Sequence, residues 1–174
     1  MKIVKTKFKG TYVINHLKKI DKRGFFMRGI CTQILKNKKI SFNIKQTNYS
    51  YNKKKLTLRG FHFQSSPFSE KKIITCIKGK ILLVILNLDK KSKNYLKHLK
   101  FNLSDNLKRS VLISKNCATA FLTLEPETLV FYYMSSYYKK NKGNGIRYND
   151  PKLKINWPKK PKVISSKDLN FENL

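Results

Sequence analysis

Short apolar runs separated by lysine-rich or glycine-containing turns make up most of the chain. Residues 40–44 alternate apolar and polar positions with period two, which indicates a half-buried β-strand. The longest apolar run, Ile81 to Leu86, also has the length of a strand. Because helical periods are few, the pattern predicts an all-β sandwich or barrel. The other strand-like runs follow one another at roughly ten-residue spacing in much of the chain and lie at residues 3–4, 12–14, 58–64, 72–77, 94–101, 111–113, 118–124 and 128–134.

Turn signals divide these runs. Lys78-Gly79-Lys80 separates two strand-like runs so closely that it predicts a β-hairpin. Asp21-Lys22-Arg23-Gly24 predicts a turn before a strand that starts at Phe25, and a short helical turn is expected near Cys31 to Leu35. From Tyr137 onward we expect ordered loops with one short helix. No repeat or linker interrupts the chain, so its 174 residues are expected to form one domain, 1–174.

The composition excludes several classes of protein. Hydrophobic residues make up 40% of the chain and aromatic residues 12%, which argues against disorder despite a net charge of +30. No apolar run reaches the roughly 18 residues of a membrane-spanning helix, and no signal peptide is apparent. Cys31, Cys76 and Cys117 are odd in number and widely spaced, so we expect reduced thiols, no zinc site and a cytoplasmic protein.

The strong positive charge raises the question of a polyanionic partner. Of the 39 basic residues only five are arginine, whereas proteins that read nucleic acid favour arginine for bidentate contacts. The lysines are spread from end to end among asparagine and isoleucine. We interpret them mainly as a compositional bias on solvated faces, and expect no specific nucleic-acid partner and no membrane contact. A negatively charged small substrate would still benefit from the positive field.

One histidine stands out because of its surroundings. His62 lies in the run Leu58 to Gln64, among apolar residues and two positions after Gly60, which permits close approach of a backbone or a ligand. Arg59 and Gln64 add a fixed cation and an amide to the same run. On spacing alone, a lone histidine in an apolar strand is more often a core histidine with its hydrogen bonds satisfied than a general base, and both interpretations stay open for His62.

The order of several motifs resembles the dTDP-4-dehydrorhamnose 3,5-epimerases, a family of cupin-like jelly-roll enzymes that act on sugar nucleotides. The resemblance spans about residues 21–168, nearly the whole chain, and rests on many motifs in the same order. The matching motifs are Asp21 to Phe26, Gln46 to Ser50, Leu58 to Gln64, Lys72, Gly79, Tyr132 to Tyr138, Ile146 to Pro151, Ile155 to Pro158 and Ser166 to Asp168.

The resemblance implies a set of catalytic roles. A 4-keto sugar has acidified C–H bonds on both sides of its carbonyl, and inverting either carbon needs a base, an acid on the opposite face and a cation at the enolate oxygen. By resemblance, His62 is the base and Asp168 pairs with its second nitrogen. Tyr132 would deliver the proton from the other face. Lys72 would stabilise the enolate.

The resemblance also implies how substrate is bound. Arg23 and Arg59 match diphosphate contacts, for which planar guanidinium groups are suited. Tyr138 matches the aromatic residue that stacks on thymine. Neither a cofactor nor a metal is implied, and a homodimer is expected in which Arg23 completes the neighbouring pocket. The remaining matched binding positions are Gln46, Asn48 and Lys167, together with Thr119 in the sugar pocket.

Some positions depart from the family pattern. Thr119 replaces a pocket histidine, and a hydroxyl cannot carry a proton charge near neutral pH. Asn87 stands where an aspartate beside the pocket is usual, Gly143 where many members have a glutamate, and Arg28 where a glutamate is frequent. The base His62, the acid Tyr132 and the enolate-stabilising Lys72 are retained, so we expect an active epimerase of a dTDP-linked 4-keto-6-deoxy sugar. Inversion of one carbon only, or binding without turnover, are the alternatives.

Without the resemblance, the same residues have simpler interpretations. The tyrosines between Tyr132 and Tyr138 could form a core or interface cluster. Asp168 could cap a helix that begins near Ser166. Lys72 and Arg59 could be ordinary surface cations. The positions of these side chains in the fold distinguish the two sets of interpretations.

Overall fold

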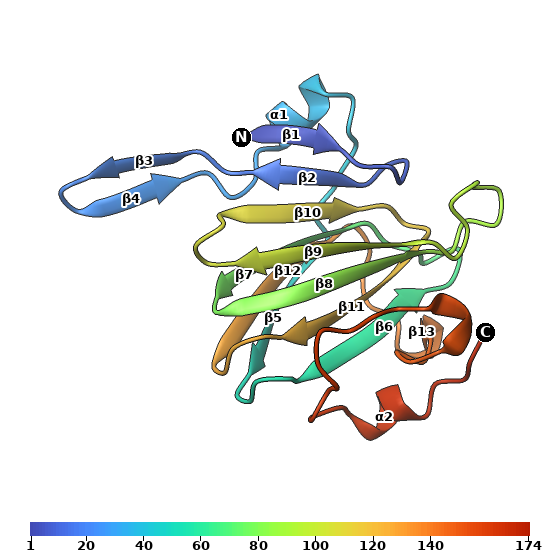
Figure 1. Cartoon of the computed structure of the whole chain (residues 1–174). Helices are drawn as coiled ribbons and strands as arrows, with labels where there is room; N and C mark the ends of the chain where they lie inside the picture. Colours follow the sequence, from blue (N-terminus) through green and yellow to red (C-terminus); the bar gives the residue numbers. More distant parts are fainter.

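Two antiparallel β-sheets packed face to face form the body of the protein, as seen in a computed structural model that describes all residues 1–174 (Figure 1). The larger sheet has six strands in the order β1-β2-β10-β7-β12-β5: Lys2–Lys5, Tyr12–Asn15, Arg109–Ile113, Lys72–Lys78, Thr128–Met134 and Gln46–Asn52. The smaller sheet has five strands in the order β13-β6-β11-β8-β9: Gly143–Gly145, Leu58–Gln64, Cys117–Thr123, Lys80–Asn87 and His98–Ser104. From β6 to β12 the chain passes back and forth between the sheets, and the predicted jelly-roll fold is confirmed.

Apolar side chains fill the space between the sheets and also cover both outer faces. The central cluster takes Ile81, Leu83 and Ile85 from one face of β8. The opposite face of β8 contributes Leu82, Val84 and Leu86 to a second cluster, which the C-terminal segment covers. Because β8 is buried on both faces, its sequence is an uninterrupted apolar run rather than an alternating one.

The link between β7 and β8 differs from the hairpin that the sequence predicts. The two strands do not pair with each other, and the single residue between them, Gly79, carries the chain from the six-stranded sheet to the five-stranded one. Gly79 has φ +77°, and a Cβ atom there would lie 2.6 Å from the Oγ1 atom of Thr128. The glycine therefore marks a crossover between sheets, and the hairpin prediction is wrong.

Two other strand predictions need correction. Residues 40–44 are not a strand: Ile40 and Phe42 are buried against the outer face of the six-stranded sheet beside α1 (Thr32–Asn37), while Ser41 is exposed. The alternation is real, but it reflects packing of an extended segment on a sheet rather than strand pairing. The strand expected from residue 94 begins at His98, because a turn around Leu96 precedes it.

The N-terminal region carries a projecting hairpin. Strands β3 (Lys18–Asp21) and β4 (Gly24–Met27) form a separate two-stranded sheet that extends away from the body, at the left of Figure 1. We call this hairpin, residues 18–27, the arm. At its base the Nδ1 atom of His16 donates a hydrogen bond to the Arg28 carbonyl at 3.0 Å, joining the two ends of the arm.

The C-terminal region combines short elements. It contains α2 (Ser166–Leu169) and two 3₁₀ turns, Lys140–Lys142 and Pro151–Leu153. Ile146, Leu153 and Trp157 of this region pack on the outer face of the five-stranded sheet, and α2 contacts β6 (Figure 1). None of the helices is long and apolar enough to cross a membrane.

Candidate active site

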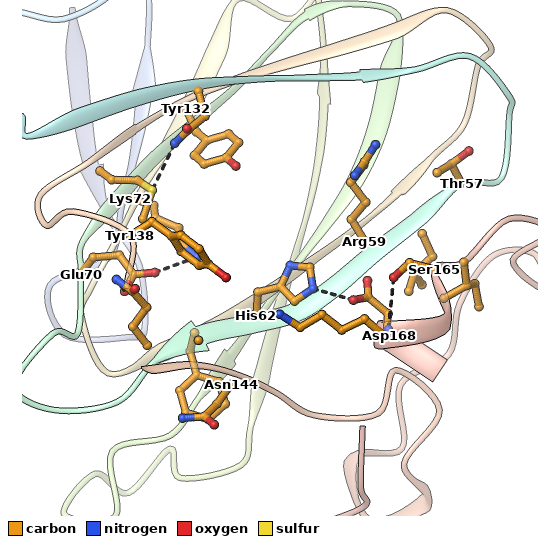
Figure 2. Close-up of a pocket in the computed structure, with 18 of the residues that line it drawn as sticks. Thr57, Arg59, His62, Glu70, Lys72, Tyr132, Tyr138, Asn144, Ser165 and Asp168 are labelled. Carbon is orange, nitrogen blue, oxygen red and sulfur yellow. Dashed lines mark hydrogen bonds and ion pairs between the residues drawn. The ribbon is translucent and has the colours of Figure 1, made fainter. Parts of the chain in front are cut away.

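A cavity of about 640 Å³ opens beside β6, between the inner face of the six-stranded sheet and the C-terminal segment (Figure 2). A smaller cavity of about 270 Å³ adjoins it and shares Arg59, His62, Lys72 and Tyr132 with its lining. Thr119 lines the smaller cavity. The structure thus brings ten of the eleven predicted site residues to one place: His62, Tyr132, Asp168, Lys72, Gln46, Asn48, Arg59, Thr119, Tyr138 and Lys167.

Strand alternation explains how polar side chains come to face the cavity. In β5, Gln46 and Asn48 point inward to line it, whereas Tyr49 and Tyr51 lie exposed on the outside of the sheet. Tyr132 on β12 is paired across the sheet with Asn48, so both approach the cavity from neighbouring strands. The polar segment Gln46 to Ser50 forms a pocket wall because every second residue faces the cavity.

His62 and Asp168 form a hydrogen-bonded pair at the floor of the cavity. The Nε2 atom of His62 lies 2.8 Å from the Oδ1 atom of Asp168, 106 residues away in sequence. An ionised carboxylate only accepts hydrogen bonds, so Nε2 carries the proton and Nδ1 keeps a free lone pair. Asp168 thereby fixes the tautomer that can act as a base.

The local structure around Asp168 places its carboxylate on β6. Ser165 caps α2 by accepting a hydrogen bond from the Asp168 backbone N–H at 3.1 Å. The second carboxylate oxygen of Asp168 accepts from the Gly60 N–H at 2.9 Å. Asp168 therefore lies in the first turn of α2 with its side chain turned toward His62, and the simpler interpretation of Asp168 as the helix cap is wrong.

The ionisation of Asp168 follows from these contacts. Burial on its own would raise the pKa of the carboxyl group, but hydrogen bonding and charge interaction with His62, and the hydrogen bond from Gly60, lower the pKa below its usual value of 3.8. Asp168 is consequently a carboxylate at neutral pH.

Gly60 allows β6 to approach β11 closely. It has φ +112°, and a Cβ atom there would lie 2.4 Å from the Thr119 carbonyl oxygen. Any other residue would push the two strands apart at the position of the His62–Asp168 pair. The glycine two positions before His62 is thus a packing requirement of the site.

Tyr132 is suited to donate a proton. Burial raises the pKa of its phenol, Glu70 raises it further, and Arg59 opposes the rise. At neutral pH the group is therefore a protonated phenol lining both cavities. Tyr133, the next residue on β12, instead packs at the outer face of the sheet with its ring 4.7 Å from that of Phe131.

Lys72 places a buried cation at the same cavity. Its ammonium group lies 3.0 Å from the Oε1 atom of Glu70, a pair drawn in Figure 2. The same ammonium lies 3.5 Å from the hydroxyl of Thr119. The Lys72 side chain is only 12% exposed, so it is not an ordinary surface cation. The cavity therefore holds a base, a proton donor and a cation from three different strands.

The remaining predicted binding residues surround the open part of the cavity. Arg59 is held from behind by Nε donating to Asn52 Oδ1 at 2.8 Å, which leaves part of its guanidinium exposed. Tyr138 is half exposed, and its backbone N–H donates to the Gln46 side chain at 3.0 Å. Gly143 packs beneath the Tyr138 ring: a Cβ atom there would lie 3.3 Å from it.

Two predicted positions lie elsewhere. Arg23 is at the tip of the arm, 84% exposed and paired with Asp21 at 2.7 Å, and does not line the cavity of its own chain. Asn87 is not among the residues that line either cavity. It ends β8, where its Oδ1 atom accepts a hydrogen bond from the Asp89 N–H at 2.8 Å and fixes the following turn.

Sequence reasoning missed Glu70, Ser165 and Asn144, all of which line the cavity. The only available signal for Glu70 was its position two residues before Lys72 at the start of a strand. Ser165 could have been found as a helix N-cap. The structure holds no group of three or more His, Cys, Asp or Glu side chains that could bind a metal ion.

Replacing Asp168 by asparagine is expected to lower kcat by about 10²–10⁴-fold, because an amide can donate to Nε2 and move the imidazole proton to Nδ1. The variant should also lose the part of the unfolding free energy that depends on an ionised Asp168. The depressed pKa of Asp168 means that its carboxylate stabilises the fold above pH 3.8, and that this contribution disappears as the pH falls through the folded-state pKa. Urea unfolding at neutral pH and near pH 3 should therefore show a smaller pH effect in Asp168→Asn than in the wild type. Equal pH dependence in the two proteins would contradict this assignment.

Comparison with known proteins gives a consistent result. Residues 5–174 match the family model described as dTDP-4-dehydrorhamnose 3,5-epimerase. The chain is 30% identical to the enzyme of that name from Shigella flexneri, in an alignment that covers 98% of this chain and 94% of the relative. It is 31% identical to the enzyme of that name from Methanothermobacter thermautotrophicus, in an alignment that covers 99% of this chain and 94% of the relative.

Solved structures agree. The crystal structure of dTDP-4-dehydrorhamnose 3,5-epimerase from Bacillus anthracis, with TDP and PPi bound, has a TM-score of 0.96 and 32% identity, covering 99% of both chains. That of dTDP-6-deoxy-D-glucose-3,5-epimerase from Legionella pneumophila, in complex with dTDP-4-keto-L-rhamnose, has a TM-score of 0.93 and 27% identity, covering 99% of this chain and 92% of the other.

Proposed function

Because the chain belongs to the dTDP-4-dehydrorhamnose 3,5-epimerase family, we propose that it epimerises a dTDP-linked 4-keto-6-deoxy sugar at the carbons beside its ketone. The observation that carries the proposal is the hydrogen bond between His62 and Asp168 in a cavity that also holds Tyr132 and Lys72. This set supplies the base, acid and cation that the reaction needs, and the family predicted from sequence motifs is confirmed.

The reaction proceeds through an enolate. The Nδ1 atom of His62 removes the proton from the sugar carbon, and the electron pair of the C–H bond moves onto the 4-oxygen. The Lys72 ammonium stabilises the negative charge that develops there. Tyr132 then delivers its proton to the opposite face of the same carbon, which inverts it. Solvent removes the proton from the imidazolium and restores the phenol.

Binding of the nucleotide is assigned to the open half of the cavity. Tyr138 is half exposed and offers a ring on which thymine can stack. Arg59 and Lys167 supply cations for the diphosphate. The amide side chains of Gln46 and Asn48 are joined by a hydrogen bond of 2.9 Å, and Gln46 also accepts from the Tyr138 N–H; both amides line the cavity and can bind polar groups of the nucleotide or sugar.

Thr119 bears on how many carbons are inverted. The hydroxyl of Thr119 cannot accept a proton to become a cation near neutral pH, so His62 is the only imidazole in the cavity. Inversion of both carbons would require His62 to act twice on a substrate that reorients its ring. Inversion of a single carbon is the alternative, and the configuration of carbons 3 and 5 in the product distinguishes the two.

The experiment uses dTDP-4-keto-6-deoxyglucose as substrate, with NMR to follow the configuration at carbons 3 and 5. Inversion at one or both carbons, together with dTDP binding by calorimetry, is expected. Binding of dTDP without inversion by folded protein would overturn the epimerase proposal in favour of a silent sugar-nucleotide binding protein.

We also propose that the protein is a homodimer in which the arm contacts a second copy. The arm exposes Ile20, Phe25 and Phe26, whose exposed fractions are 76%, 51% and 67%. A two-stranded hairpin with so much apolar surface is marginal by itself, so a second copy would cover it. Arg23 at its tip would then lie at the partner's cavity.

Sedimentation velocity should therefore give twice the chain mass of 20.5 kDa. Phe26→Ser should shift the protein toward the monomer. A monomeric wild type at micromolar concentration would contradict the dimer.

The cellular location is proposed to be the cytoplasm. The cysteines Cys31, Cys76 and Cys117 are all free, as suits a reducing compartment. Burial raises the pKa of Cys76 to about 12, so its thiol stays protonated and unreactive.

A further inference from the structure

We propose that Glu70 is a positioning residue for Lys72, and that Gln64 links this ion pair to the segment that carries Tyr138. One buried network would then fix the proton-transfer half and the nucleotide half of the cavity relative to each other. The inference rests on the proposed epimerase function.

The ion pair of Glu70 and Lys72 is buried. Their side chains are 4% and 12% exposed, and the charged atoms lie 3.0 Å apart. In the two other ion pairs of the structure, His62–Asp168 and Arg23–Asp21, at least one side chain is 43% exposed or more. A carboxylate buried to this degree strongly disfavours loss of its partner, so it holds the Lys72 ammonium in one place.

The geometry leaves Lys72 free to act on the substrate. A lysine has a flexible stem of four carbons and three N–H donors, and by itself it occupies many rotamers. Glu70 accepts from one of these donors and Thr119 lies 3.5 Å from the ammonium. The remaining donor is available for the 4-oxygen of the sugar.

Glu70 itself is not arranged to act as an acid or base. Its Oε1 atom is bound to Lys72, and its Oε2 atom accepts from the Gln64 amide at 3.2 Å. With both oxygens engaged and the side chain 4% exposed, the carboxylate acts through Lys72 rather than on the substrate.

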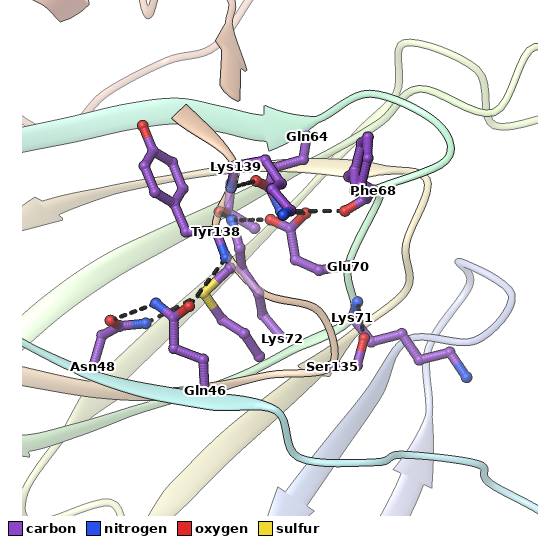
Figure 3. Close-up of polar contacts among 12 residues, drawn as sticks. Gln46, Asn48, Gln64, Phe68, Glu70, Lys71, Lys72, Ser135, Tyr138 and Lys139 are labelled. Carbon is purple, nitrogen blue, oxygen red and sulfur yellow. Dashed lines mark hydrogen bonds and ion pairs between the residues drawn. The ribbon is translucent and has the colours of Figure 1, made fainter. Parts of the chain in front are cut away.

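Gln64 extends the network toward the nucleotide (Figure 3). The Gln64 amide nitrogen that lies near Glu70 also lies 3.1 Å from the Phe68 carbonyl and 3.2 Å from the Tyr137 carbonyl, so its two hydrogens are shared among three acceptors. The Oε1 atom of Gln64 accepts a hydrogen bond from the Lys139 N–H at 2.7 Å. Gln64 therefore holds the residues on both sides of Tyr138. The Glu70 carboxylate is one hydrogen-bonding side chain away from the segment that presents this ring.

The experiment compares Glu70→Gln with the wild type, alone and in a Lys72→Met background. Turnover is followed by NMR, and dTDP affinity is measured by calorimetry. We expect Glu70→Gln to lower kcat by about 10–100-fold, because loss of the charge lets the ammonium move by roughly an ångström. The dissociation constant for dTDP should change by less than about threefold, since Gln64 keeps its bonds to the Tyr138 segment. Glu125→Gln, an exposed carboxylate in the turn after β11, is the matched control and should leave kcat unchanged.

The double-mutant cycle separates positioning from a general structural role. If Glu70 acts through Lys72, then Glu70→Gln should lower kcat by less than about twofold in the Lys72→Met background. An equal loss in both backgrounds would overturn the proposal, as would unchanged kcat in the single variant. Glu70→Asp keeps the charge but withdraws it by one methylene, and it replaces Glu70→Gln in the cycle if the latter fails to fold. Absence of turnover in the wild type would count against the proposed function rather than against this network.

Discussion

Replacing His62 by alanine is expected to lower kcat by about 10²–10⁴-fold, the range that one acid–base group supplies. The Nδ1 atom of His62 is the only imidazole nitrogen with a free lone pair at the cavity, because Asp168 binds Nε2 at 2.8 Å. Turnover measured by NMR should fall, while dTDP affinity measured by calorimetry should change little, since Arg59 and Tyr138 remain in place.

His98 gives the matched control for that variant. It lies at the start of β9, outside both cavities. His98→Ala should retain kcat within about twofold, because His98 has no contact with the proton-transfer groups. A folded His62→Ala protein with wild-type turnover would rule out His62 as the base.

Replacing Lys72 by methionine is expected to lower kcat by about 10²–10³-fold. Methionine fills similar space but removes the cation from the developing enolate oxygen, and such electrostatic stabilisation is worth this much in comparable sites. The variant should also be less stable by about 3 kcal/mol, because the buried Glu70 carboxylate loses its partner. Both quantities are accessible, the first by NMR turnover and the second by urea unfolding at neutral pH.

The neighbouring lysine is the control. Lys71 points outward, where its ammonium donates to the Ser41 carbonyl at 2.6 Å. Lys71→Met should therefore leave kcat unchanged and lower the stability by less than about 1 kcal/mol. If Lys71→Met and Lys72→Met reduced activity equally, the effect would be one of overall charge rather than of a specific cation.

The strands could be predicted from the sequence where the apolar residues of a run are all buried between layers of the fold. The apolar run of β8 and the runs of β10, β11 and β12 became strands, because each packs between layers in the way that its residues indicate. The pattern was misleading where the same alternation serves another purpose. Residues 40–44 alternate because they pack along a sheet without pairing, and Gly79 makes a crossover rather than a hairpin turn.

The site could be predicted only in part. Composition and spacing left His62 as either a core residue or a base, and the choice depends on Asp168, which the fold brings from 106 residues away. The resemblance to a family supplied that pairing. Glu70 was missed because nothing in a single sequence distinguishes a buried carboxylate from an exposed one. Asn87 lies at the end of β8, outside the residues that line the two cavities, and its Oδ1 atom accepts a hydrogen bond from the Asp89 N–H.

In the proposed mechanism His62 removes a proton from one face of the sugar carbon and Tyr132 delivers a proton to the opposite face. A variant that lacks the Tyr132 hydroxyl should therefore separate proton removal from inversion. In Tyr132→Phe, His62 can still remove a proton, exchange it with solvent and return it to the same face of the sugar. The side chain of His62 is 43% exposed, so its proton can exchange. Tyr133→Phe is the control, because Tyr133 is the adjacent residue of β12 and packs at the outer face of the sheet.

The most direct measurement is therefore deuterium incorporation by Tyr132→Phe in heavy water, with NMR reporting both deuterium and configuration at carbons 3 and 5. Our account predicts that deuterium enters at the carbon or carbons that the wild type inverts, without inversion. Inversion at the wild-type rate, or folded Tyr132→Phe protein that binds dTDP but incorporates no deuterium, would contradict a mechanism in which His62 and Tyr132 act on opposite faces.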